Sequence, residues 1–243
     1  MTNYSEYSLA SSLSFLADSQ AAISNNVANA TTSGYKRKTP IAVLQRTEFQ
    51  SLLGTNLPSV RYSERTDFTP GSQRTSHRMN VAIGKDQFFR VKSNNGTFYT
   101  QRGEFIVNKS GELVTPNGET YLSIGGQLIR VNDAQEIRIQ SDGTVLGKRE
   151  DTELELGRLG IFQIPDQTKL TSIGRSLYFD KGNQEITPHA AGTVRQGYIE
   201  ESNVDVLSEL VQMISVQRSF GATTKAMTTI DRIQDSFIQT MSR

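Results

Sequence analysis

The chain of 243 residues contains no cysteine, no tryptophan and only two histidines. Without cysteine it can form no disulfide, no cysteine-ligated zinc site and no thiol nucleophile, and cysteine usage does not distinguish an oxidising from a reducing compartment. The histidines, His77 and His189, are far apart in the sequence and stand in polar, turn-rich segments, so we expect both at the surface.

Catalytic motifs are also missing. Two separated histidines among scattered carboxylates form neither a catalytic triad nor a metal-ligand spacing, and the sequence has no phosphate-binding loop, dinucleotide fingerprint or nucleophile elbow. Phe88 and Phe89 are candidates for a ligand patch, but we expect them to be core residues of a strand. We therefore predict that the chain is not an enzyme and has no catalytic residue, no cofactor and no metal site.

An excess of one charge and a long apolar run are absent too. Lys plus Arg is 26 and Asp plus Glu is 25, which argues against a nucleic-acid partner. The only basic cluster, Lys36-Arg37-Lys38, is expected to be a solvated helix end, with a nucleic-acid contact as the alternative. No run of about 18 apolar residues is present, so we expect no stable membrane insertion. Residues Met1 to Ala30 lack the basic start and apolar block of a cleaved secretory signal.

Both ends of the chain carry apolar residues at alternating spacings of four and three, the pattern of helices that pack along a seam. Near the start these positions are Leu9, Leu13, Leu16, Gln20, Ile23, Val27 and Ala30; near the end they are Met213, Val216, Phe220, Thr223, Met227, Ile230, Gln234, Phe237 and Met241. Further apolar residues of the C-terminal helix spread over adjacent faces: Val206, Leu207, Leu210, Val211, Ile214, Ala222, Ala226, Ile233 and Ile238. Such a helix needs several neighbours to bury it. The alternative is an ordinary helical hairpin docked on the rest of the chain.

The N-terminal helix, expected over about residues 5–30, is rich in serine and asparagine. Both are indifferent helix formers, so we expect this helix to be frayed alone and to gain its stability from packing. The C-terminal helix is expected to begin with Asn203 or Asp205 as its cap and to be interrupted in composition only by Gly221.

The middle of the chain has a different pattern. Short strand-like runs from Met79 to about residue 190 are separated by turn signals such as Asn95-Gly96, Asn117-Gly118 and Asp142-Gly143. The piece from Ile41 to Leu53 is weaker, either helical or extended. We predict an α+β fold in which N- and C-terminal helices pair as a coiled-coil tube element around a central all-β domain. The expected segments are an N-terminal axial helix (1–35), an extended linker or loop (36–78), the β domain (79–195) and a C-terminal axial helix (196–243).

Residues 23–36 (ISNNVANATTSGYK) and residues 196–206 (QGYIEESNVDV) form two distinctive motifs. They resemble the N-terminal and the C-terminal signature, respectively, of the rod and hook axial proteins of the bacterial flagellum. Asn80–Gly84, Phe88–Val91 and Tyr99–Phe105 resemble the body motif of the larger members. Lys85-Asp86-Gln87, Asn80 and Gly221 depart from the family pattern, which leaves one β turn and a possible helix bend open.

The resemblance implies a structural subunit of the flagellar rod, or drive shaft. Such subunits leave the cytoplasm through the flagellar type III export apparatus without signal cleavage and polymerise helically through their terminal helices, enclosing the export channel and transmitting torque. The implied partners are further copies of the chain, other rod and hook proteins and the export apparatus, and the implied location is the basal body beyond the cytoplasmic membrane.

Subunit contacts are expected on both helices. On the N-terminal helix they are Leu9, Leu13, Leu16, Ile23, Val27, Asn25, Asn26 and Asn29; on the C-terminal helix they are Val206, Leu210, Met213, Ile214, Val216, Phe220, Met227, Ile230, Phe237 and Met241. The motifs around Gln217–Phe220 and Tyr35–Arg37 favour the distal-rod type, whereas the modest length favours the proximal type; we take the distal type as the prediction. A secreted adhesive or carbohydrate-binding β protein with a coiled-coil oligomerisation tail is the alternative from another class.

Overall fold

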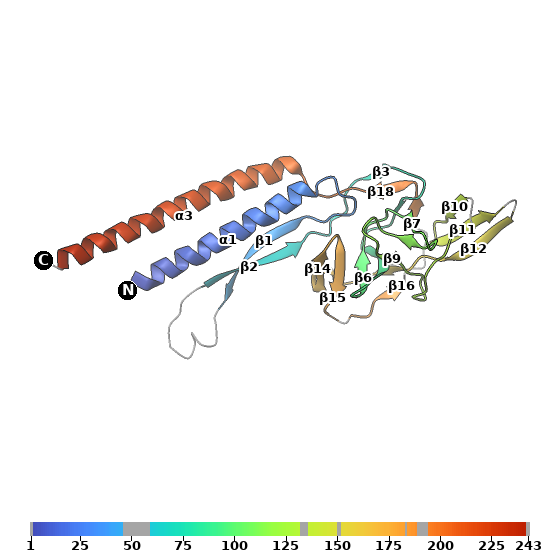
Figure 1. Cartoon of the computed structure of the whole chain (residues 1–243), viewed down its shortest axis with the longest axis horizontal. Coiled ribbons are helices and arrows are strands. Elements are labelled where there is room, and N and C mark those ends of the chain that lie inside the picture. Colours follow the sequence, from blue (N-terminus) through green and yellow to red (C-terminus); the bar gives the residue numbers. More distant parts are fainter. Residues whose placement is uncertain are drawn as a thin grey trace. The chain divides into compact units, whose positions relative to one another are not determined.

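The computed structural model describes residues 2–45, 59–131, 136–149, 152–182, 184–188 and 194–241. Its helices are α1 (Thr2–Ala28), α3 (Val206–Met241) and the short 3-10 helix η1 (Gln167–Lys169). Its strands are β1 (Lys38–Gln45), β2 (Ser59–Thr66), β3 (Gln73–Thr75), β4 (Val81–Ala82), β5 (Gln87–Ser93), β6 (Gly96–Thr100), β7 (Ile106–Val107), β8 (Leu113–Val114), β9 (Thr120–Tyr121), β10 (Glu136–Ile139), β11 (Thr144–Arg149), β12 (Thr152–Arg158), β13 (Ile161–Gln163), β14 (Leu170–Gly174), β15 (Leu177–Asp180), β16 (Thr187–Pro188), β17 (Arg195–Gln196) and β18 (Tyr198–Glu200). Two terminal helices and a mostly-β middle make an α+β protein, as predicted (Figure 1).

The chain divides into two compact units. The helical unit contains Met1–Ala28, Lys38–Arg65 and Asp205–Arg243, and the β unit contains Asn29–Arg37 and Thr66–Val204. The predicted segments 1–35, 36–78 and 196–243 are therefore each shared between the two units. Sequence patterns follow the type of local structure, whereas these units are set by contacts between segments that are distant along the chain.

In the helical unit, α1 and α3 lie side by side in opposite directions (Figure 1). Glu209 at the start of α3 accepts a hydrogen bond from Asn26 near the end of α1, at 2.9 Å. Gln234 near the end of α3 donates to Glu6 near the start of α1. Asp205 caps α3, because its carboxylate accepts from the Leu207 backbone N–H at 3.0 Å and from the Ser208 hydroxyl at 2.8 Å. Of the two predicted caps, Asp205 is therefore the one used.

One face of α3 is less exposed than the rest of the helix. Its members are Glu209, Met213, Val216, Thr223, Met227, Ile230 and Gln234, which are buried or half-buried while their neighbours along the helix are exposed. From Met213 to Gln234 they follow the predicted alternation of four and three except at Phe220, which is exposed, and the first and last members of the face bond to α1. The predicted seam is thus the face of α3 that meets α1; that the pair is a coiled coil stays a prediction.

Two strands complete the helical unit. Strands β1 and β2 pair in a two-stranded sheet beside α1, and the Phe15 ring of α1 lies 6.4 Å from that of Tyr62 on β2. Residues Ile41–Gln45, for which a helix or an extended piece was expected, are extended, because Pro40 and the β-branched residues around it disfavour a helix. The rest of that piece, up to Leu53, lies outside the described residues.

The β unit is built on a nine-stranded sheet. Its main path runs β14-β15-β6-β5-β9-β8-β7, with β13 and β16 attached through β5, and a separate antiparallel sheet has the order β10-β11-β12. The turn between β5 and β6 falls on Asn94 and Asn95, one residue before the predicted Asn95-Gly96, and Ser93 pairs with Gly96. The region from Met79 to about residue 190 is made of short strands, as expected.

The core of the β unit has two parts, on opposite faces of β5. Phe89 packs in the larger cluster with Phe105 and Tyr121, whose ring centroids lie 5.4 and 5.6 Å from its own. Phe88 packs in the smaller cluster with Tyr178. Phe88 is 0% exposed and Phe89 is 1% exposed, so the prediction that both phenylalanines are core residues is confirmed.

Candidate assembly surface

The N-terminal signature places a buried amide at the centre of the helical unit. Asn26 is 0% exposed, and its Nδ2 donates to the Lys38 carbonyl at 2.8 Å and to Glu209 Oε2 at 2.9 Å. Its Oδ1 accepts from the Lys38 backbone N–H at 2.9 Å. One side chain therefore joins α1, β1 and α3, and an amide suits the position because it donates and accepts at once. That Asn26 is also a subunit contact stays a prediction.

A buried ion pair joins the two signatures in the β unit. Lys36 Nζ donates to Glu200 Oε1 at 2.6 Å and to the Thr69 carbonyl at 3.1 Å, and the two side chains are 0% and 5% exposed. The Gly71 N–H also donates to Glu200 Oε1, at 3.0 Å. The prediction that Lys36 belongs to a solvated helix end is wrong: α1 ends at Ala28, and the lysine packs against the C-terminal signature.

Asn203 of the C-terminal signature acts in the same way. Its Oδ1 accepts from the Arg37 backbone N–H at 2.8 Å, and its Nδ2 donates to the carbonyls of Asp67 and Thr69, both at 2.9 Å. The signature residues thus tie the start and the end of the chain together by buried and half-buried polar contacts. No pattern in the sequence indicates the pairing of Lys36 with Glu200, because the two lie 164 positions apart.

Apolar side chains are exposed on the faces of α3 that turn away from α1. The exposed fractions are 72% for Leu207, 43% for Leu210, 60% for Val211 and 50% for Ile214. Ile233 and Ile238 are exposed as well, and so are Val206, Phe220 and Phe237, although these three lie at the spacing of the seam. Large exposed apolar residues along one helix mark a surface that buries itself against a partner.

The other predicted contact residues are distributed as follows. In α1, Ile23 is buried, Asn25 is exposed, and four residues are half-buried: Leu9, Leu13, Leu16 and Val27. Asn29, just after the end of α1, is half-buried. On the face of α3 toward α1, Met213, Val216, Met227 and Ile230 are half-buried, and the side chain of Met241 lies outside the described residues. The structure therefore separates the predicted set into a group within the chain and an exposed group on α3.

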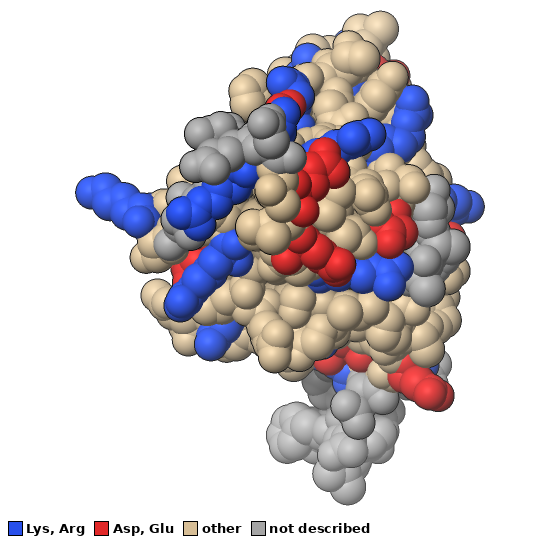
Figure 2. Space-filling model, turned by 90° about the vertical axis from the view of Figure 1, so that its right-hand side faces the viewer, with Lys and Arg blue, Asp and Glu red and all other residues tan. Residues whose placement is uncertain are grey.

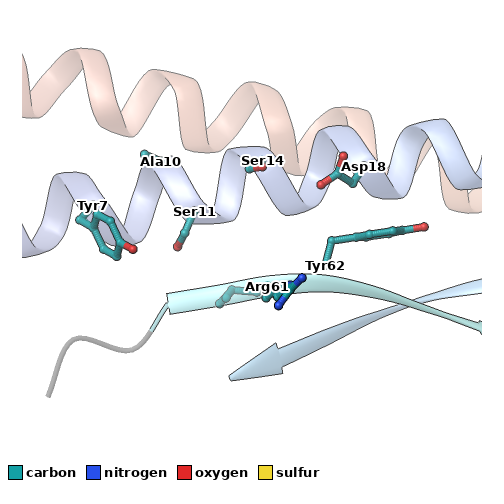
Figure 3. A pocket seen from close by; sticks show the side chains of 8 residues that line it. Tyr7, Ala10, Ser11, Ser14, Asp18, Arg61 and Tyr62 are labelled. Carbon is teal, nitrogen blue, oxygen red and sulfur yellow. The ribbon is translucent and has the colours of Figure 1, made fainter. Parts of the chain in front are cut away.

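A groove of about 490 Å³ runs between α1 and β2 in the helical unit (Figure 3). It is lined by Tyr7, Ala10, Ser11, Ser14, Asp18, Val60, Arg61 and Tyr62. Burial, together with the nearby carboxylate of Glu64, raises the pKa of Tyr62 to about 12. The described lining holds one carboxylate, Asp18, and no histidine.

The β unit presents charges of both signs. Figure 2 shows acidic side chains near the middle of one face with Lys and Arg side chains around them. A cavity of about 330 Å³ beside β10 and β11 likewise mixes Arg78, Arg138 and Lys148 with Glu136 and Glu153. Such alternation gives no extended field of one sign.

No group of three or more metal-ligating side chains is found among the described residues. His77 is exposed, as expected, whereas His189 lies outside the described residues. No helix in the described part of the chain is long and apolar enough to cross a membrane.

Three segments of the sequence match families of known proteins. The flagella basal body rod protein family matches residues 7–36, the flagellar hook protein FlgE/F/G D1 domain matches residues 82–147, and the flagellar basal body rod FlgEFG protein C-terminal family matches residues 195–240. These segments contain both signatures and the body motif except for its first two residues, Asn80 and Val81.

Relatives that match most of the chain belong to the same group of flagellar proteins. The flagellar basal-body rod protein FlgG of Bacillus subtilis is 30% identical over 89% of this chain and 90% of its own length. FlgG of Buchnera aphidicola (subsp. Acyrthosiphon pisum) is 31% identical over 89% and 92%, and the basal-body rod protein FlgF of Caulobacter vibrioides is 27% identical over 91% of each. The chain therefore belongs to the flagellar basal-body rod protein family and is a structural component of the flagellum, not an enzyme.

Proposed function

We propose that this chain polymerises helically through its terminal helices and thereby forms part of the rod, a hollow shaft that transmits torque and encloses the export channel. The observation that carries the proposal is the exposed apolar surface of α3, from Leu207 to Ile214. Because each side chain is already partly covered, each contributes roughly 1 kcal/mol when a neighbouring subunit buries the rest. A subunit interface that does not close on itself generates a helical filament.

Export and partners follow from the same proposal. The subunit leaves the cytoplasm through the flagellar export apparatus with its N-terminus uncleaved, and it assembles with further copies and with other rod and hook proteins beyond the cytoplasmic membrane. The serine- and asparagine-rich sequence of α1 supports this route, because a weakly stable helix unfolds easily for passage and refolds when it packs. We propose the distal-rod type. The family relationship gives the adhesive alternative no support.

The test is self-association of the purified full-length chain, followed by sedimentation velocity over a concentration series. Leu210→Asp on α3 is compared with Leu154→Asp on β12, since the two leucines have nearly equal exposure, 43% and 47%. We expect Leu210→Asp to raise the concentration needed for assembly by about tenfold or more and Leu154→Asp to leave it unchanged. A wild-type chain that stays monomeric throughout, or equal effects of the two variants, would overturn the proposal.

A further inference from the structure

All the sulfur of this chain is in methionine, because the sequence has five methionines and no cysteine. Three of them, Met79, Met213 and Met227, have described side chains, and all three are half-buried. Met79 packs against the larger core cluster of the β unit. Met213 and Met227 both lie on the face of α3 toward α1, separated by about four helical turns. The contact between the two helices is therefore the place where sulfur is concentrated.

The two methionines supply half of the apolar residues that α3 presents to α1. The other two apolar members of the half-buried face are Val216 and Ile230. A thioether on a flexible side chain fills uneven gaps between packed residues. Because both methionines are only half-buried, solvent reaches part of each side chain while the helix stays folded, and a small oxidant in the solvent reaches it too.

A hydroperoxide converts such a side chain by transfer of one oxygen atom. The thioether sulfur attacks one peroxide oxygen, the O–O bond breaks, and the sulfur becomes a sulfoxide. The sulfur is oxidised by two electrons and the peroxide is reduced, and its other oxygen leaves with the proton as water or an alcohol. The flexible apolar side chain thereby becomes a polar one, and the change is reversible by sulfoxide reductases.

Helix α1 has no cationic donor for the new oxygen, because it contains neither Lys nor Arg. Two covered hydroxyls of α1 are already committed to their own helix: that of Ser12 donates to the Ser8 carbonyl at 2.8 Å, and that of Ser19 to the Phe15 carbonyl at 2.7 Å. Closing the helix contact over a sulfoxide therefore removes water from its oxygen and offers none of these groups in return. Covering a polar group without a new hydrogen bond is unfavourable.

We propose that Met213 and Met227 are sites of reversible oxidation by a hydroperoxide, and that their sulfoxides loosen α3 from α1 while the β unit stays intact. The proposal goes beyond the proposed function and does not depend on it, because the helix contact lies within one chain. It assigns to the two side chains a chemical sensitivity that the valine and isoleucine of the same face do not have.

The test uses the full-length chain as dilute protein, treated with hydrogen peroxide until peptide mass spectrometry shows sulfoxide at both positions. Circular dichroism at 222 nm then follows the helices during heating. We expect the midpoint for loss of the helical signal to fall by about 5–15 °C and to return after treatment with methionine sulfoxide reductases of both stereospecificities. Hydrogen exchange of strands β5 and β6 should stay unchanged.

Leucine variants assign the effect to the two sites. Met213→Leu/Met227→Leu keeps an apolar side chain of similar volume, so its helical signal should not respond to peroxide. Met79→Leu is the matched control and should respond as the wild type does. If the double variant does not fold, the single variants Met213→Leu and Met227→Leu replace it, and each should lose part of the response.

Four results would overturn the proposal. One is a wild-type chain oxidised at both positions whose helical midpoint does not move. Another is a leucine variant, double or single, that responds as strongly as the wild type, which would assign the effect to another methionine. The third is equal loss of protection in β5 and β6, which would mean general unfolding. The last is resistance of both positions to peroxide while Met79 is oxidised, which would mean that the oxidant does not reach the helix contact.

Discussion

Removing the ammonium group of Lys36 tests whether the two signature segments hold the β unit together. In Lys36→Met the side-chain volume is nearly kept, but the buried carboxylate of Glu200 loses the ammonium and keeps the Gly71 N–H as the remaining one of these two donors. Breaking a buried ion pair by removing one partner costs about 3–5 kcal/mol. For a unit of this size, a loss of that magnitude lowers the melting temperature by roughly 6–20 °C.

The neighbouring lysine provides the control. Lys38 pairs with Glu64 at 2.7 Å, but these side chains are 21% and 35% exposed. Ion pairs of this kind contribute about 1 kcal/mol or less. Lys38→Met should therefore shift the urea or thermal transition much less than Lys36→Met, although both remove one charge from the same basic run.

A double variant separates the ion pair from the packing. Replacing a buried pair by apolar side chains is often close to neutral, so Lys36→Met/Glu200→Met should recover a large part of the stability lost in Lys36→Met. Calorimetry and urea unfolding measure the three variants. Equal, small losses for Lys36→Met and Lys38→Met, or a double variant that is less stable than Lys36→Met, would refute this reasoning.

Three further changes test other contacts. Asn26→Ala removes the buried amide that joins α1, β1 and α3 and should lower the free energy of unfolding by about 1–3 kcal/mol in urea titrations, whereas Ala at the exposed Asn25 should cost less. Gly103→Ala places a Cβ 1.7 Å from the Val81 carbonyl oxygen and should destabilise the chain by about 2 kcal/mol or more, whereas Gly221→Ala in open space should stabilise isolated α3 by up to about 1 kcal/mol. Hydrogen bonds from the Ser208 hydroxyl and the Leu207 N–H lower the pKa of Asp205 below its ordinary value. The cap therefore stabilises the helix at any pH above the ordinary pKa, and this stabilisation is lost as the pH falls through the lowered pKa. Circular dichroism should show a loss of helicity in acid that the Asp205→Ala variant lacks.

The sequence predicted the terminal helices well because their information is local. The alternation from Met213 to Gln234 identified the face of α3 that meets α1, and the turn residues marked most of the strands. It did not predict that β1 and β2 belong with the helices, because their position depends on Asn26 and other distant contacts. It also gave the wrong environment for Lys36, since a basic run is normally solvated and nothing near it in sequence announces Glu200.

The predicted subunit-contact set stays a prediction, and it combines residues of two kinds. Periodicity alone placed the seam residues and the exposed apolar residues of α3 in one interface set. Exposure separates them: Ile23 and Asn26 are used within the chain, while Leu207 and Val211, left out of that set, are among the most exposed apolar residues of α3. Which face of a helix is taken by its own chain becomes visible only once the partner element is in place.

Hydrogen exchange tests the central claim that the terminal helices are completed by assembly. Amide exchange is measured along the full-length chain as dilute monomer and as assembled polymer, with the β unit as internal reference. We expect residues of α1 and α3 to exchange quickly in the monomer and to become strongly protected in the polymer, while the core strands β5 and β6 are protected in both. Helices already fully protected in the dilute monomer, with no change on assembly, would contradict the account.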